Sequence, residues 1–188
     1  MTLPRLQKKY EQEVKPKLKD QLGMSNLGAV PRLIKVVVSV GISEEQRQEA
    51  LEGMGRQLAL ITGQKPVETR AKKSIAEFKI RAGEPVGLKV TLRGKRMYQF
   101  VDKLINVVLP QIKDFQGVAE DGFDGKGNYT LGLKEQVVFP ELTYDTIDKI
   151  RGLEVTLVTS AVQDSQGQAL LALLGVPFTK EVREVRGG

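Results

Sequence analysis

The sequence contains no cysteine, no histidine and no tryptophan among its 188 residues. Without cysteine the chain cannot form disulfide bonds, thiol nucleophiles or thiolate metal sites. Without histidine it lacks the usual imidazole base and the commonest metal ligand, so most familiar catalytic arrangements cannot be built. No apolar run resembles a signal peptide or approaches the length of a membrane span. We therefore expect a soluble, cytoplasmic protein whose residue types disfavour catalysis.

Positive charge is gathered in two segments of the chain. Residues 1–35 carry a net charge of +5 and residues 64–103 carry +7, whereas residues 36–63 carry −2 and residues 104–188 carry −4. Charge that is segregated in this way is typical of a protein with one face for a polyanion. The hydrophobic content of 40% is ordinary for a globular protein, and the length suits one domain with a buried core.

The spacing of hydrophobic residues predicts helices and strands interleaved along the chain. We expect helices over residues 6–22 (interrupted at Pro16), 51–61 (capped by Ser43 and Gln46 and ended by Gly63), 97–108 (closed by Pro110), 164–174 (ended by Gly175) and after Thr143. We expect strands over residues 33–39, 88–93, 136–139 and 153–159, and a long loop over residues 111–132. Several strands lack the connecting helix that parallel pairing requires. The sequence therefore predicts a single-domain α+β fold, with a mostly antiparallel sheet, helices packed on one face and the other face exposed.

Basic residues gather on one expected strand and on the loop before it. Within LKVTLR (88–93), the residues that point away from the core are Lys89, Thr91 and Arg93. The preceding loop and its surroundings hold Lys65, Arg70, Lys72, Lys73, Lys79 and Arg81, interleaved with Ile75, Phe78 and Ile80. Local packing under the loop would account for one or two of these apolar residues. Phosphate oxygens bind cations and hydroxyl or amide donors, and aromatic residues for stacking are few. The pattern therefore favours recognition of a structured RNA by its shape and backbone.

The stretch DGFDGKGNYT (121–130) has the composition of an ion-binding or phosphate-binding loop but not the spacing. As a calcium loop that starts at Asp124, it has Lys126 at the third position and Tyr129 where glycine is required. As a phosphate loop it lacks the terminal Gly-Lys-Ser/Thr. We expect a tight turn of glycine and aspartate residues here.

Two alternatives to RNA binding remain open from the residues. An RNA-processing enzyme could bind a divalent metal ion through acids of the long loop, although these lack the fixed spacing that coordination demands; they are Asp114, Glu120, Asp121 and Asp124. A protein-interaction module could use the basic face to bind an acidic partner. Ser74 beside Lys72 and Lys73 could be a nucleophile pair, but nothing nearby predicts a desolvated lysine. The sequence favours a binding protein with no catalytic residue, no metal site and no cofactor.

Three segments of the chain together resemble one known family. They are GQKPVETRAKKSIAEFKIRAGEPVGLKVTLRGKRMYQF (63–100), FDGKGNYTLGLKEQVVFPE (123–141) and LLALLGVPFTK (170–180). In order and spacing, the chain from about Leu3 to Lys180 is similar to the bacterial large-subunit ribosomal protein number five, the universal 5S rRNA-binding family. The resemblance implies a single domain over residues 1–180, with a basic loop at about 72–84, and a flexible C-terminal tail over residues 181–188.

By this resemblance, the protein is expected to be a structural constituent of the large subunit of the cytoplasmic ribosome. Its exposed, concave sheet face would bind 5S rRNA and adjacent large-subunit rRNA in the central protuberance. Its basic loop would approach the elbow of peptidyl-site tRNA. The protein would also contribute to an intersubunit bridge to small-subunit protein thirteen, and no membrane partner is implied.

The resemblance also assigns residues to these roles. The family's 5S-contacting positions correspond to Gln64, Thr91 and Ser39, where Ser39 replaces the family's asparagine. Serine keeps a donor and an acceptor but is shorter than asparagine, so a bridging water could complete its contact. The whole expected 5S rRNA-binding set is Ser39, Gln64, Lys65, Arg70, Lys89, Thr91 and Arg93. The expected tRNA-proximal set is Lys72, Lys73, Ser74, Lys79 and Arg81.

Overall fold

A five-stranded antiparallel sheet organises the protein, which a computed structural model describes over residues 3–43 and 47–179. The strands are β1 (Leu33–Gly41), β2 (Val67–Arg70), β3 (Pro85–Leu92), β4 (Tyr129–Leu133) and β5 (Leu153–Thr159). They lie in the order β2-β3-β1-β5-β4, so β2 and β4 form the two edges. Every neighbouring pair is antiparallel, which confirms the expected kind of sheet.

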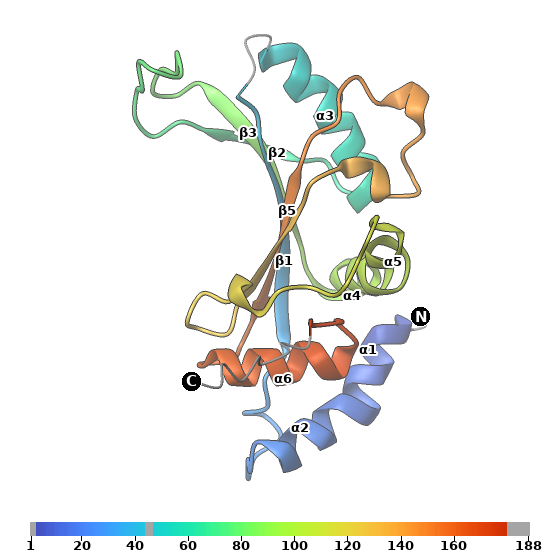
Figure 1. Cartoon of the computed structure of the whole chain (residues 1–188). Helices are drawn as coiled ribbons and strands as arrows, with labels where there is room; N and C mark the ends of the chain where they lie inside the picture. The colour runs from blue at the N-terminus through green and yellow to red at the C-terminus, as the bar shows by residue number, and fades with distance from the viewer. Residues whose placement is uncertain (1–2, 44–46, 180–188) are drawn as a thin grey trace, which may run out of the picture.

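Helices occupy one face and one end of this sheet. They are α1 (Arg5–Lys9), α2 (Lys15–Gln21), α3 (Arg47–Thr62), α4 (Gly94–Lys103), α5 (Leu109–Gln111) and α6 (Asp164–Leu174), with π-helical η1 (Tyr10–Val14) and η2 (Leu104–Val108) and the 3-10 turns η3 (Glu120–Gly122), η4 (Gln136–Val138) and η5 (Tyr144–Thr146). Figure 1 shows α3 and the α4–η2–α5 helix on one face of the sheet, and α6 with α1 and α2 at one end of it. Among the described residues, no helix covers the middle of the opposite face (Figure 1), so the expected one-sided packing is confirmed.

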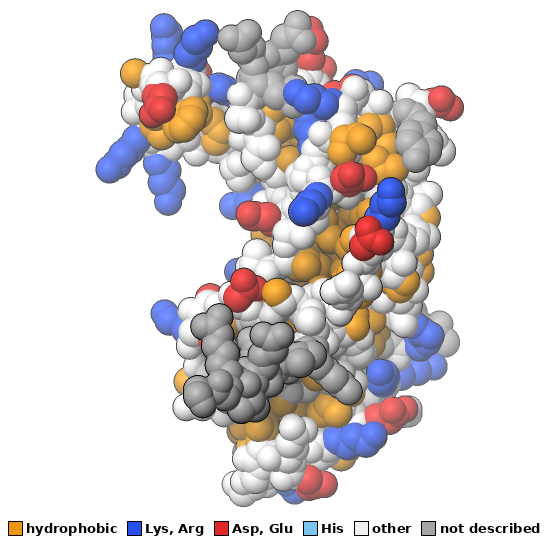
Figure 2. Space-filling view, viewed as in Figure 1, with side chains coloured by type: hydrophobic (Ala, Val, Ile, Leu, Met, Phe, Trp, Pro, Cys, Tyr) orange, Lys and Arg blue, Asp and Glu red, His pale blue; other side chains and the backbone are white. Residues whose placement is uncertain are grey.

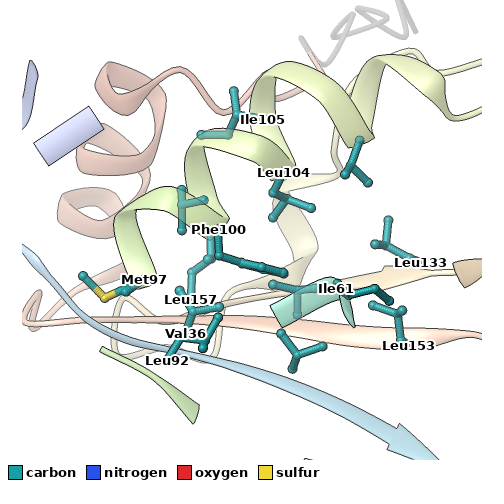
Figure 3. Packing of buried hydrophobic residues seen from close by; sticks show 14 of the residues in the cluster. Val36, Ile61, Leu92, Met97, Phe100, Leu104, Ile105, Leu133, Leu153 and Leu157 are labelled. Atoms are coloured by element: carbon teal, nitrogen blue, oxygen red, sulfur yellow. The ribbon is translucent and has the colours of Figure 1, made fainter. Parts of the chain in front are cut away.

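The helical side of the sheet carries the hydrophobic core. On β1 the inward side chains of Val36, Val38 and Val40 are at most 4% exposed, while the residues between them are half-buried. Figure 3 shows Phe100 and Leu104 directed from the α4–η2 helix at the sheet. Burying one such side chain contributes about 1.5–3 kcal/mol, so the alternation along each strand decides which face packs and which stays open.

Several predicted ends of elements are confirmed. Pro16 lies in the first turn of α2, directly after π-helical η1, so it begins the second half of the N-terminal helix. Gly63 follows α3 with a φ of +65°, and Gly175 follows α6 with a φ of +113°, a conformation that glycine adopts without strain. Gln46 of the expected helix cap and the expected tail at 181–188 lie outside the described residues. Across the described ranges, no helix has both the length and the apolar composition needed to cross a membrane.

The strand expected at residues 136–139 is wrong. Gln136–Val138 forms the 3-10 turn η4, and the strand β4 lies earlier, where it overlaps the end of the stretch expected to be a loop. The side chain of Gln136 is fully buried, where its Nε2 donates to the carbonyl oxygen of Lys149 (2.7 Å) and its Oε1 accepts from the backbone N–H of Arg151 (2.5 Å). These bonds fix a turn at a position where two valines favour a strand, because a buried amide needs partners.

The helix expected after Thr143 is also wrong in extent, since it amounts to the single turn η5. The backbone N–H and the hydroxyl of Thr146 both donate to the carbonyl oxygen of Thr143, at 2.9 and 2.7 Å. The chain then turns so that Asp148 can pair with Arg151, whose guanidinium donates to both carboxylate oxygens at 2.9 and 2.8 Å. This ion pair, rather than a helix, holds the segment before β5.

Candidate nucleic-acid interface

The uncovered face of the sheet carries two rows of side chains that run across the strands. One row is Thr130, Thr156, Val37 and Thr91, and the next is Gly132, Glu154, Ser39, Lys89 and Val67, as the strand register gives them. Hydroxyls therefore dominate the first row, where the Oγ1 atoms of Thr130 and Thr156 lie 3.1 Å apart. The second row places an acid and a base on either side of Ser39. Such a surface offers hydroxyl donors and acceptors together with a cation, the groups that bind phosphates and sugars of a nucleic acid.

Gln64 and Thr91 lie together at the edge of this face. Gly63 ends α3, and the hydroxyl of Thr62 accepts a hydrogen bond from the backbone N–H of Gln64 (3.3 Å), which fixes the start of the next segment. The Nε2 of Gln64 then donates to the main-chain carbonyl oxygen of Thr91 at 3.2 Å. Strand β2 begins at Val67, so the Gln64 side chain takes the place of a strand residue beside Thr91. Two residues expected to bind 5S rRNA are thus brought together.

The other residues of the expected 5S rRNA-binding set are more spread. Ser39 lies directly opposite Lys89, and both face the uncovered side. Lys65 is exposed between Gln64 and β2, and Arg93 is exposed at the N-cap of α4. Arg70 lies at the base of the β2–β3 hairpin, where it donates to the carbonyl oxygen of Gly83 (3.3 Å) and pairs with Glu68 (3.6 Å). The structure therefore groups Ser39, Gln64, Lys89 and Thr91 and leaves the three remaining cations at the rim.

The basic loop is a hydrogen-bonded extension of the β2–β3 hairpin. Ile75 and Ile80 exchange two backbone hydrogen bonds of 2.9 and 3.1 Å across its tip, and the backbone N–H of Lys79 donates to Ala76 (3.0 Å) to close the turn. The hydroxyl of Ser74 accepts from the backbone N–H of Ala82 at 2.9 Å, so this side chain joins the two arms of the hairpin. Figure 2 shows the hairpin as a lobe with many Lys and Arg side chains that overhangs a hollow in the molecule.

The apolar residues of the hairpin are not hidden beneath it. Phe78 is 59% exposed and Ile75 is 44% exposed, while Ile80 is half-buried. Lys72, Lys73, Lys79 and Arg81 are all exposed around them. Local packing therefore accounts for Ile80 at most, and the hairpin presents apolar groups within a cationic surface.

The loop at residues 124–128 is the tight turn that its glycines predict. The carboxylate of Asp124 accepts from the backbone N–H groups of Lys126 (2.9 Å) and Asn128 (3.1 Å) and from the Asn128 amide (2.7 Å). The hydrogen bond from the Asn128 side chain is the largest cause that lowers the pKa of Asp124. Asp164 at the start of α6 accepts from the N–H groups of Gly125 and Gly127. In the described part of the chain, no three acids converge on a possible metal position.

Some polar residues of the uncovered face were missed by sequence reasoning. They are Thr69, Thr130, Glu154 and Thr156, whose side chains share this face with Ser39 and Lys89. The alternation in LEVTLVT (153–159) could have indicated Glu154 and Thr156, because Leu153, Val155 and Leu157 are inward. It could not have shown that β5 lies next to β1.

Comparison with known proteins identifies what the chain is similar to. A family model described as ribosomal protein L5 matches residues 26–81, and a second model, which describes the C-terminus of the same ribosomal protein family, matches residues 85–178. The large ribosomal subunit protein uL5 of a Thermoanaerobacter species is 54% identical over 179 residues, which cover 95% of this chain and 100% of that relative. The protein of the same name from Chloroflexus aurantiacus is 57% identical over 175 residues, which cover 93% of this chain and 97% of the relative.

Proposed function

The chain belongs to the ribosomal protein L5 family, and from this premise we propose that its uncovered sheet face binds 5S rRNA and adjacent large-subunit rRNA. Members of the family are structural proteins of the large ribosomal subunit and not enzymes, so the protein acts by binding RNA within the cytoplasmic ribosome. The alternative hypothesis of an RNA-processing enzyme, with a metal ion bound by the acids of the long loop, is therefore wrong.

The observation that carries the 5S rRNA proposal is the juxtaposition of Gln64 and Thr91 on a face that no described helix covers. Ser39 and Lys89 lie in the adjacent row, and exposed Lys65 and Arg93 flank it. Cations at the rim bind phosphates and hold the RNA in register, while the hydroxyls of the face and the Gln64 amide at its edge meet riboses and base edges. The arrangement suits an RNA of defined shape.

Equilibrium binding tests this proposal directly. Purified protein is titrated with 5S rRNA over a series of salt concentrations, with an unrelated structured RNA of equal length as competitor. We expect preferential binding of 5S rRNA, with an affinity that falls steeply as salt rises because phosphate neutralisation releases counterions. Equal affinity for both RNAs would show a merely electrostatic surface and would contradict the proposal.

We propose further that the β2–β3 hairpin contacts peptidyl-site tRNA. The support is the position of the hairpin, which projects from the sheet with Lys72, Lys73 and Arg81 exposed and with a hydrogen-bonded tip. The hydrogen bonds across the tip restrict its backbone, which reduces the conformational entropy that binding costs. Ribosomes that carry a hairpin replaced by a neutral one of equal length are expected to show lower tRNA occupancy, and unchanged occupancy would contradict this role.

The bridge to small-subunit protein thirteen and the single domain over residues 1–180 are proposals that rest on the family resemblance. Cross-linking between this protein and small-subunit protein thirteen in joined ribosomes tests the bridge. The absence of such a cross-link would contradict the bridge.

Limited proteolysis tests the domain, because one folding unit gives one protected fragment. Several stable fragments would contradict a single domain.

A further inference from the structure

A hollow of about 620 Å³ lies on the uncovered face. It is formed at one end of the sheet, where β1 and β4 end and β3 and β5 begin. Its lining includes Ser39, Gly41, Thr69, Gly132 and Glu154, all of which face the uncovered side by the strand register. No residue of α3 lines it, although α3 packs against β3 on the other face of the sheet. The hollow is therefore part of the face that we propose to bind RNA.

Glu154 is the unusual residue of this hollow. It lies directly opposite Ser39 on one side and Gly132 on the other, and its side chain is exposed. Within the described part of the chain, none of the ion pairs involves Glu154. A carboxylate repels phosphate, so a residue that only had to suit a polyanion would not be an acid. A carboxylate accepts hydrogen bonds strongly from neutral donors, and RNA carries such donors on its riboses and bases.

Two glycines beside Glu154, Gly41 and Gly132, form the floor of the hollow, and neither is required by packing within the protein. A Cβ atom added to Gly41 or to Gly132 would meet no other atom within 4 Å, and neither glycine has a positive φ. By contrast, a Cβ on Gly87 would come within 2.4 Å of the carbonyl oxygen of Val40, so packing requires that glycine. A strand glycine that packing does not require is typical of a place where another molecule approaches the backbone closely.

We propose that Glu154 recognises a nucleotide seated on Gly41 and Gly132, by accepting a hydrogen bond from a neutral donor of the RNA. The donor is a ribose 2′-hydroxyl or the amino edge of a base, and Lys134, which lines the same hollow, neutralises the adjoining phosphate. This inference rests on the proposed binding of 5S rRNA. It assigns to Glu154 a role in specificity: an RNA that places a hydrogen-bond donor at the carboxylate binds, whereas one that places a phosphate there is repelled.

Binding of 5S rRNA by Glu154→Ala tests the proposal. We expect this variant to bind about tenfold more weakly than the wild type, since the RNA donor loses a charged acceptor. Glu154→Gln keeps an acceptor oxygen and should lose less. The matched control is Glu52→Ala, which removes an exposed acid from α3 on the helical side. Removing a negative charge that does not touch the RNA should leave binding of a polyanion unchanged or tighter. The same result for Glu154→Ala would overturn the inference.

Interference mapping identifies the donor. Two kinds of 5S rRNA pool are selected for binding to wild type and to Glu154→Ala: one with sparse 2′-deoxy substitutions, and one with sparse analogues of guanine, adenine or cytosine that lack the exocyclic amino group. We expect a position at which the substitution weakens binding to the wild type but not to the variant. A 2′-deoxy position identifies a ribose donor, and a base-analogue position identifies an amino donor. Identical patterns for the two proteins would overturn the role of Glu154 while leaving the 5S rRNA proposal intact. If the wild type shows no preference for 5S rRNA, both proposals fail.

Discussion

Gln64 and Thr91 are joined by a hydrogen bond in which the side-chain Nε2 of Gln64 donates to the main-chain carbonyl oxygen of Thr91, at 3.2 Å. Lys89 is the last residue of β3 that pairs with β2. Beyond it, the Gln64 amide supplies the hydrogen-bond donor that a longer β2 would otherwise offer to β3. One side chain thus completes the sheet edge and is held at the rim of the proposed RNA face. The hydroxyl of Thr91 is not needed for this bond, so the two residues can be tested separately.

Thr91→Val and Gln64→Ala are predicted to act differently on stability. Thr91→Val keeps the carbonyl group and the β-branched shape, so the free energy of unfolding in urea should change little. Gln64→Ala removes the donor to the carbonyl and should lower the free energy of unfolding by about 0.5–1.5 kcal/mol. Both variants should bind 5S rRNA more weakly, with a loss of about 1–3 kcal/mol for each buried hydrogen bond to the RNA. Unchanged affinity in both would show that neither side chain meets RNA.

Neutralising the hairpin is predicted to weaken RNA binding without unfolding the protein. Replacing Lys72, Lys73 and Arg81 by glutamine removes three exposed charges, and the backbone bonds of the tip remain. The peptidyl-site tRNA occupancy of ribosomes with this variant should fall. The slope of the logarithm of the RNA-binding constant against the logarithm of salt concentration should decrease by about one unit for each phosphate that the hairpin no longer neutralises. The urea midpoint should stay within error of the wild type.

A control with equal charge separates a local interaction from general attraction. Lys8, Lys17 and Lys113 are exposed and lie outside the hairpin, so their replacement by glutamine lowers the net charge by the same amount. If the control reduces tRNA occupancy as much as the hairpin variant does, the hairpin makes no specific interaction.

The elements that could be predicted from sequence are those whose pattern is local. β1 is rich in β-branched residues and β3 and β5 alternate, while α6 runs from Asp164 to Leu174 with Gly175 after it, as its spacing indicates. β4 could not be predicted in this way, because its five residues include a glycine and follow a glycine-rich turn. Its existence depends on pairing with β5, which is a tertiary fact. The turn at Gln136 likewise depends on partners that come later in the chain.

The candidate site was predictable residue by residue but not as an arrangement. Gln64 and Thr91 stand 27 positions apart in sequence, and no local pattern states that one bonds the other. Glu154 could not be predicted as a site residue, because an exposed acid on a strand indicates no site until the sheet order places it beside Ser39. Sequence periodicity gives the face of each strand, whereas the neighbours on that face come from long-range pairing.

Asp148 is predicted to make stability depend on acid pH. Its hydrogen bond from Arg151 lowers its pKa from 3.8 to about 2. A carboxylate whose pKa is lower in the folded state stabilises that state above the unfolded pKa and ceases to do so as pH falls through the folded pKa. The contribution should therefore be complete above about pH 4 and lost towards pH 2. Urea unfolding over this range measures it.

The matched variant is Asp148→Asn, which cannot titrate. It should remove that part of the pH dependence and lower the free energy of unfolding at neutral pH by about 1 kcal/mol, a modest value because solvent screens the half-exposed carboxylate. Parallel curves for wild type and variant between pH 2 and 5 would show that this ion pair is not responsible.

Two glycines of the sheet are predicted to respond in opposite ways to alanine. In Gly87→Ala the new methyl group would come within 2.4 Å of the Val40 carbonyl oxygen, so β1 and β3 must separate, at a cost of about 1–3 kcal/mol. In Gly132→Ala the methyl group meets nothing within 4 Å, and the lower entropy of the unfolded chain should raise stability by about 0.4–1 kcal/mol. Yet the same methyl group occupies the floor beside Glu154, so Gly132→Ala should bind 5S rRNA more weakly than the wild type. Urea unfolding and RNA titration of one preparation measure both effects. A Gly132→Ala protein that is more stable and binds 5S rRNA as tightly as the wild type would show that no nucleotide reaches this floor.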